Sequence, residues 1–147
     1  MAMQKATIGA IAIIAIVGVV MSTLGALTVS QTFSNSGSIT AIGVGVYSNS
    51  GCTTVLSSIN WGTISPGASA TVTIYVENNG TVPVTLSMTT GNWNPATASN
   101  YITLSWNTQN YVLAAGSSVQ ALLTLNVSSS VNGIASFAFN ITITGTQ

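Results

Sequence analysis

Apolar and polar side chains alternate in short runs from residue 42 to residue 143, and this period of two strongly limits the folds open to the chain. The apolar residues occupy every second position in runs at 42–46, 72–76, 84–88, 102–106, 123–127 and 137–143. Such alternation is typical of antiparallel strands with one buried face. With one more strand expected within 53–61, the pattern predicts about seven or eight antiparallel strands.

Turn signals separate these runs. They are Ser65-Pro66-Gly67, Asn78-Asn79-Gly80, Asn94-Pro95, Ala114-Ala115-Gly116 and Val131-Asn132-Gly133. The Asn78-Asn79-Gly80 turn predicts a hairpin between the strands at 72–76 and 84–88. Short strands at this spacing fit an immunoglobulin-like sandwich of two sheets. We therefore expect an all-β domain over residues 39–147.

The N-terminal part of the chain has a different pattern. Residues 6–29 contain no charge and are apolar on every side of a helical projection. A helix of that length would reach about 36 Å, enough to span a hydrocarbon core of about 30 Å. Because it has no polar face, such a helix must be buried in lipid or among copies of itself. The expected class is thus α+β, with a leader at 1–5, a long apolar helix at 6–29 and a polar hinge at 30–38.

Three interpretations of this N-terminal segment remain open. It is a secretory signal, although the candidate sites near Val29 fit poorly, or it is a permanent membrane anchor. In the third interpretation, cleavage between Lys5 and Ala6 leaves the apolar segment in the mature protein. Small residues spread through it permit close helix contacts. We expect the helix assembly face to be formed by Ile8, Ile11, Ile14, Ile16 and Val19.

Charge is almost missing from the chain. Only 1% of residues are charged, against roughly 25% in ordinary soluble domains. The two charged residues are Lys5 and Glu77, and the net charge is zero. Zero net charge favours self-association, so a homopolymer is expected. The missing basic patches argue against a nucleic-acid partner, and the scarcity of titratable groups predicts stability that changes little with pH.

The sequence also lacks the combinations of side chains that common catalytic and metal sites require. The chain has neither His nor Asp, which excludes a Ser-His-Asp triad, and it has no cluster of ligands for zinc or calcium. No glycine-rich phosphate loop is present. We therefore expect no enzyme activity, no cofactor, no metal and no small-molecule substrate. Glu77 is expected to be a solvated strand end, and the single Cys52 a partly buried small residue or an intersubunit disulfide.

Three Asn-x-Ser/Thr sequences are candidate sites of N-glycosylation. Asn79 falls in a turn, whereas Asn126 and Asn140 fall on the polar faces of their expected strands. All three are therefore expected to be accessible to covalently attached glycans.

The three tryptophans have two interpretations. They could form a platform for sugars, or they could be structural. Trp106 lies on the inward face of its expected strand, while Trp61 and Trp93 flank turns. The structural interpretation, with Trp106 in the core and the other two closing the sandwich ends, is favoured.

The stretches 60–67 (NWGTISPG), 70–76 (ATVTIYV) and 77–86 (ENNGTVPVTL) resemble immunoglobulin-like domains of archaeal secreted proteins. The N-terminal layout resembles archaeal type IV pilins, and Lys5-Ala6 matches the basic-then-small cleavage pattern of that family. This resemblance implies a glycosylated structural subunit of an extracellular surface filament. The subunit would be inserted in the membrane before assembly, would polymerise through its N-terminal helix and would serve adhesion.

Two alternatives stand beside the pilin. The chain is also similar to archaeal thread filaments, in which a signal peptide is removed and a segment near 28–45 completes the neighbouring subunit's sandwich by strand addition. The other alternative is a membrane-anchored immunoglobulin-like module that binds sugars or a surface layer. The first predicts a mature N-terminus near residues 25–31, and the second predicts a monomer with an exposed aromatic patch.

Overall fold

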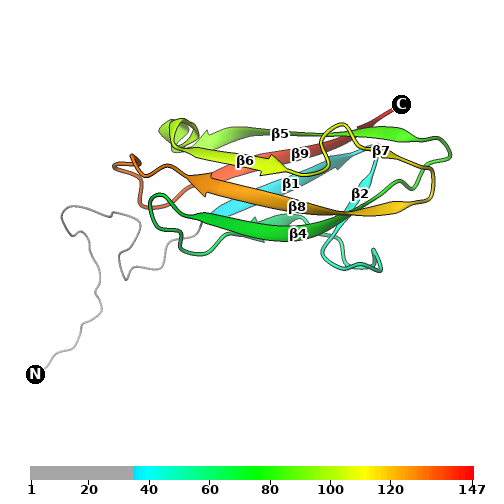
Figure 1. Ribbon diagram of the computed structural model, residues 1–147, viewed down its shortest axis with the longest axis horizontal. Coiled ribbons are helices and arrows are strands. Elements are labelled where there is room, and N and C mark those ends of the chain that lie inside the picture. The colour runs from blue at the N-terminus through cyan, green and yellow to red at the C-terminus, as the bar shows by residue number, and fades with distance from the viewer. Residues whose placement is uncertain (1–34) are drawn as a thin grey trace, which may run out of the picture.

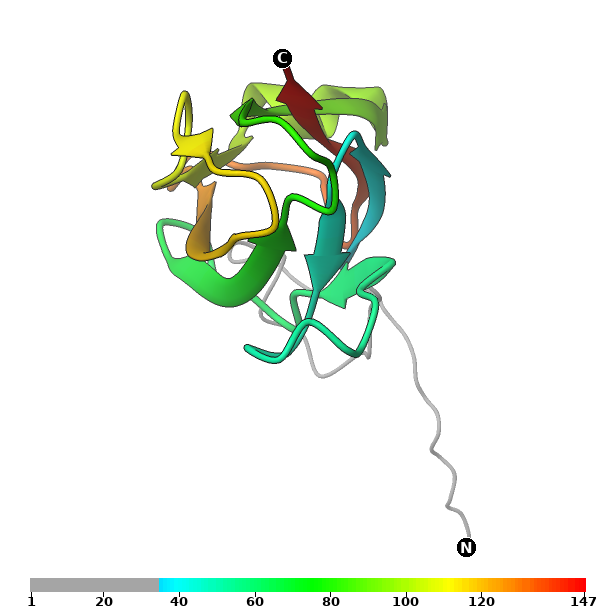
Figure 2. The ribbon, with the colours of Figure 1, turned by 90° about the vertical axis from the view of Figure 1, so that its right-hand side faces the viewer.

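The computed structural model describes residues 35–147, which form two β-sheets packed face to face (Figure 1). The five-stranded sheet has the order β3-β1-β9-β5-β7, and the four-stranded sheet has the order β2-β4-β8-β6. The strands are β1 (Ser36–Ile42), β2 (Gly45–Tyr47), β3 (Ser58–Asn60), β4 (Ser69–Glu77), β5 (Val84–Asn94), β6 (Ile102–Trp106), β7 (Val112–Leu113), β8 (Ser118–Val127) and β9 (Ala138–Thr146). Figure 2 looks along the strands and shows the two layers.

The expected α+β class is wrong, because the described residues are nearly all β. Their one helical element is a short 3-10 turn, η3 (Ala96–Asn100). No helix within the described part of the chain is long and apolar enough to cross a membrane. The period of two that runs through this part leaves no stretch with helical periodicity, which is the physical reason for the all-β result. The helix expected at 6–29 and the leader at 1–5 lie outside the described residues.

The strand count and the pairing also differ from the expectation. Residues 35–147 form nine strands rather than seven or eight, and not all of the pairs are antiparallel. β1 runs parallel to β9, in a register that places Ser36 beside Ala138 and Ile42 beside Thr144. β1 starts at Ser36, inside the segment expected as a hinge. The alternation did not reveal it because Gly37, which is buried in the sheet, has no side chain to mark the inward face.

The apolar run at 42–46 is not one strand. β1 ends at Ile42 in the five-stranded sheet, and β2 begins at Gly45 in the four-stranded sheet. Between them Gly43 has a φ of 73°, and a Cβ there would lie 2.5 Å from the carbonyl oxygen of Gly145. Only glycine fits this sharp turn without strain. The chain changes sheets here, which leaves Ile42 exposed.

The hairpin predicted at Asn78-Asn79-Gly80 is wrong as well. β4, before the turn, pairs with β2 and β8, whereas β5, after it, pairs with β7 and β9. The turn therefore connects the two sheets. Asn78 is fully buried, its Nδ2 donates to the carbonyl oxygens of Val82 at 2.8 Å and Leu113 at 3.1 Å, and its Oδ1 accepts from the Gly80 amide at 2.9 Å. A buried side chain that satisfies three backbone groups determines the course of the turn.

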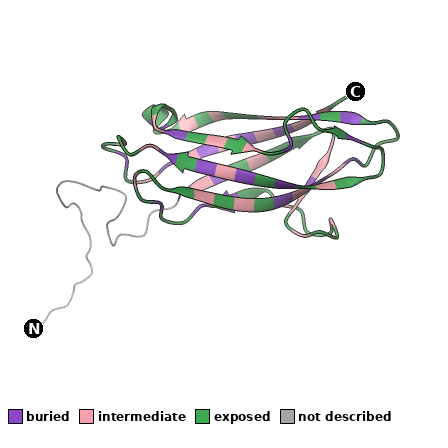
Figure 3. Ribbon diagram, viewed as in Figure 1, coloured by how far each residue is buried: buried purple, intermediate pink, exposed green. Residues whose placement is uncertain are grey.

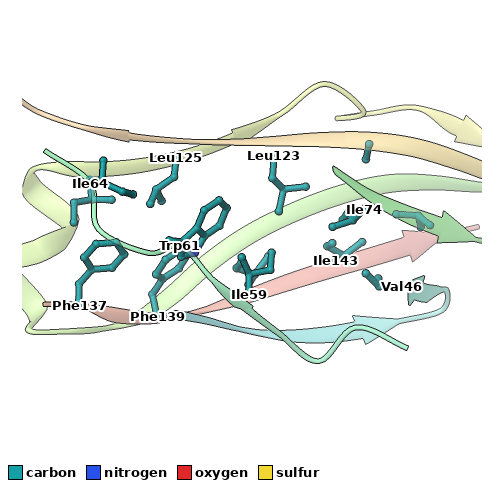
Figure 4. Packing of buried hydrophobic residues seen from close by; sticks show 14 of the residues in the cluster. Val46, Ile59, Trp61, Ile64, Ile74, Leu123, Leu125, Phe137, Phe139 and Ile143 are labelled. Carbon is teal, nitrogen blue, oxygen red and sulfur yellow. The ribbon is translucent and has the colours of Figure 1, made fainter. Parts of the chain in front are cut away.

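One hydrophobic core lies between the sheets. Along β8 and β9 buried and less buried residues alternate, as the sequence pattern predicts (Figure 3). Central contributions come from Leu123 and Leu125 of β8 and from Phe139 and Ile143 of β9 (Figure 4). Burial of each such side chain stabilises the fold by about 1.5–3 kcal/mol.

Candidate assembly edges and modification sites

Glu77 is the one charged side chain among residues 35–147, and it lies half-buried at the end of β4. This part of the chain has no group of three side chains able to hold a metal ion. Close to Glu77 lies the thiol of Cys52, in the loop between β2 and β3. The Cys52 thiol is the one nucleophilic sulfur described.

The Cys52 loop is fixed by Asn49. Its Oδ1 accepts from the amides of Thr53 at 3.1 Å and Thr54 at 2.9 Å. Burial raises the pKa of the Cys52 thiol, the Glu77 carboxylate raises this pKa further, and a hydrogen bond with Ser118 acts in the opposite direction. The thiol is consequently protonated near neutral pH and a weak nucleophile. This result favours the interpretation of Cys52 as a partly buried small residue.

The three glycosylation candidates lie in different surroundings. Asn79 is exposed in the turn between the sheets, and its Nδ2 donates to the Tyr47 hydroxyl at 3.4 Å. Asn126 is exposed on the outer face of β8. Asn140 lies on the outer face of β9, where β1 and β5 flank it, and it is only half-exposed. The accessibility that the sequence predicts is thus complete at two sites and partial at Asn140.

The tryptophans do not form a common platform. Trp61 is buried between the sheets (Figure 4). It lies close to Gly37, and its Nε1 has no hydrogen-bond partner among the described residues. Trp93 stacks on Phe139 with ring centroids 4.1 Å apart. Trp106, expected in the core, is only half-buried because β6 is an edge strand. Its Nε1 donates to Gln109 Oε1 at 2.8 Å.

The predicted N-terminal site residues lie outside the described part of the chain. These are the cleavage pair Lys5 and Ala6 and the assembly-face residues Ile8, Ile11, Ile14, Ile16 and Val19. Within the sandwich, the candidate assembly surfaces are the strand edges, because unpaired backbone groups there can bind another strand.

The edges of the five-stranded sheet are largely covered. β3 pairs with the start of β1, and the Ile39 amide then donates to the Ser57 carbonyl oxygen at 2.8 Å. On the opposite edge, the short strand β7 pairs with the start of β5. Beyond β7 the Leu86 amide donates to the Tyr111 carbonyl oxygen at 2.9 Å, and the Met88 amide donates to Gln109 Oε1 at 3.1 Å. Loop residues thus bind outward-facing backbone groups of β1 and β5, the strands next to the two edges.

One edge of the four-stranded sheet is the first half of β4, which we call the β4 edge (Ser69–Thr73). β2 pairs with β4 only from Tyr75 to Glu77. The Val127 amide donates to the Ala68 carbonyl oxygen at 3.0 Å, which shows that even-numbered residues here direct their backbone groups to β8. Because these directions alternate along a strand, the odd-numbered residues from Ser69 to Thr73 direct theirs outward. No other described strand pairs with them.

The opposite edge of this sheet is β6, which pairs with β8 alone and which we call the β6 edge (Ile102–Trp106). The Ser128 amide donates to the Tyr101 carbonyl oxygen at 2.7 Å, so odd-numbered residues here face β8. The backbone groups of Ile102, Leu104 and Trp106 therefore point outward. The inward-facing side chains Val72 on the β4 edge and Leu104 on the β6 edge are only half-buried.

Sequence reasoning missed both edges. The signal available was the lack of any lysine, arginine or proline within 69–77 and 102–106, residues that usually protect an edge strand. The sequence did not show that these strands lie at edges.

The chain matches no known protein-family model and no curated protein.

Proposed function

We propose that this chain is a structural subunit of an extracellular filament, built from many copies of itself and used for adhesion. The observation that carries the proposal is a sandwich of two β-sheets in which residues 35–147 have one charged side chain. A surface with so little charge offers little repulsion between copies, and a soluble monomer normally avoids that state. The apolar segment at 6–29 supplies a second surface that must be buried, first in the membrane and then among copies.

The proposal is tested by imaging the full chain in negative stain. Wild-type protein should form filaments, and Ile14→Asp should abolish them because a charge within an apolar contact is costly to desolvate. Ile14→Val keeps the position apolar and should assemble like the wild type. Unimpaired assembly of Ile14→Asp would exclude polymerisation through this segment, and dispersed wild-type particles would exclude the filament itself.

A second candidate is the thread-type subunit, in which a segment near 28–45 completes the sandwich of the next copy. It is favoured by β1, which lies within that segment and pairs with β9 over its whole length. Most side chains of β1 are exposed, so this strand contributes little to its own core. Sequencing of the mature N-terminus separates the two candidates. A terminus at Ala6 supports the pilin, and one near residues 25–31 supports the thread.

Covalent glycans are part of the proposal. Asn79 and Asn126 are exposed in the described domain, and their bulky hydrophilic sugars would supply the solubility that charges do not. Intact-mass measurement of native material should show mass above that of the polypeptide. A spectrum with the bare polypeptide mass would remove glycosylation from the proposal and leave the filament intact.

A further inference from the structure

We propose that the β4 edge of one copy pairs with the β6 edge of the next, so that the four-stranded sheet continues from copy to copy. The inference rests on the proposed structural role and names a surface through which the sandwiches themselves would join. The occupant of each edge is a second copy of this chain.

The arrangement of the sheet makes the two edges compatible. β4 and β6 lie on opposite sides of β8 (Figure 1), and both run antiparallel to it, so they run parallel to each other. A copy shifted sideways within the plane of the sheet would place its β6 beside the β4 edge in parallel orientation. Outward N–H and C=O groups at alternate positions on each edge are what a parallel ladder requires.

Both edges also leave apolar surface uncovered. Val72 on β4 and Leu104 on β6 face the core side of the sheet but remain half-exposed, whereas Leu123 and Leu125 on the central strand β8 are fully buried. An added strand would cover these half-exposed side chains. No charged side chain or proline lies within Ser69–Thr73 or Ile102–Trp106 to oppose such pairing.

The two edges differ from each other, so their contact is heterologous. Such a contact leaves a free β4 edge at one end of any assembly and a free β6 edge at the other, and it repeats without closing unless the rotation forms a ring. Edge pairing therefore extends an assembly of copies along a single axis. The five-stranded sheet is less suited to it, because the amides of Leu86 and Met88 are already occupied by loop acceptors.

The test uses proline variants of the full chain. Thr71→Pro removes an outward N–H from the β4 edge and leaves the bonds to β8 in place, and Leu104→Pro does the same on the β6 edge. Thr71→Val and Leu104→Ala change the same side chains but keep the N–H. Circular dichroism checks that each variant is folded, sedimentation velocity measures association, and negative-stain imaging measures filament length.

Each proline variant alone should show at least a tenfold loss of mean polymer length, while the matched controls polymerise like the wild type. An equimolar mixture of Thr71→Pro and Leu104→Pro should form dimers, because the intact β6 edge of the first meets the intact β4 edge of the second. Wild-type polymer length in a folded proline variant, or a mixture that stays monomeric, would overturn the inference. Loss in Thr71→Pro alone would instead indicate β4 pairing with β4.

A second arrangement keeps the test decisive if Leu104→Pro does not fold. Thr71→Pro retains the β6 edge, so a tenth of a molar equivalent added to wild type should cap growing ends and shorten the polymers. Unshortened polymers would contradict edge pairing. If both proline variants form filaments, edge pairing is excluded and the proposed structural role is retained. If edge-dependent oligomers form but never grow into filaments, edge pairing is retained and the filament role is excluded. A wild-type chain that stays monomeric would exclude both.

Discussion

The two sheets of the sandwich treat their edges differently. In the five-stranded sheet, short strands and loop acceptors cover much of both edges, and the central strand β9 has partners on both sides. In the four-stranded sheet, the first half of β4 and all of β6 pair on one side only within the described chain. Residues 35–147 contain no lysine that could protect an edge, so each edge is either covered by the chain itself or left open to a partner.

The largest effect should come from the centre of the five-stranded sheet. Phe139 is buried on β9 beneath Trp93, and Phe139→Ala should lower the free energy of unfolding by about 4 kcal/mol because it leaves a cavity. Chemical denaturation of the two proteins measures this. Val72→Ala, at the open β4 edge, should cost only about 1 kcal/mol because Val72 is half-exposed. Equal losses would show that the two regions do not differ.

The second-largest loss of stability is expected at the Asn78 turn, which connects the two sheets. Asn78→Ala removes a buried side chain that bonds three backbone groups and should cost about 2–3 kcal/mol, since those groups are left unpaired. Asn79→Ala changes the adjacent exposed residue and should cost under about 0.5 kcal/mol. Thermal unfolding compares the pair. A stable Asn78→Ala protein would mean that the turn is held by other contacts.

Proline scanning measures the edges themselves. Met88→Pro deletes an amide that donates to Gln109 and should cost about 2 kcal/mol through the lost hydrogen bond and the altered side chain. Thr71→Pro deletes an amide that points away from β8 and should cost less than about 1 kcal/mol. Urea titration of both variants reports the difference. If Thr71→Pro were the more damaging change, the assignment of outward groups on β4 would be incorrect.

A smaller effect concerns the thiol beside the end of β4. Burial and the Glu77 carboxylate raise the pKa of Cys52, so the reactive thiolate is scarce at pH 8. Glu77→Gln removes the neighbouring negative charge, lowers this pKa and should increase the rate of alkylation by iodoacetamide several-fold. Glu77→Asp retains the charge and serves as the control. An unchanged rate in Glu77→Gln would show that burial alone sets the reactivity.

The smallest expected effect is the response to acid. Glu77 is the one acidic side chain between residues 35 and 147, and this stretch contains no histidine. The free energy of unfolding should therefore change by less than about 1 kcal/mol from pH 7 to pH 3. Denaturation curves at several pH values test this. A sharp acid transition would require a titrating group that the sequence does not contain.

Much of the strand content could be predicted from the sequence. Runs at 72–76, 84–88 and 123–127 fall within β4, β5 and β8, because each has several consecutive inward side chains to mark one face. β1 was missed since Gly37 leaves no such mark, and β7 is too short to show a period. At the candidate assembly surface, the sequence showed that protective charges were missing but not which strands lacked a neighbour.

The sequence by itself determined the alternation, the near-absence of charge and the absence of His and Asp, because these are properties of residue types in order. Tertiary structure decided that Gly43 carries the chain from one sheet to the other and that the Asn78 turn does the same. It also decided that the β4 and β6 edges pair with no further strand among residues 35–147. Pairing between strands distant along the chain depends on how the sheets close around their core, and local periodicity does not encode it.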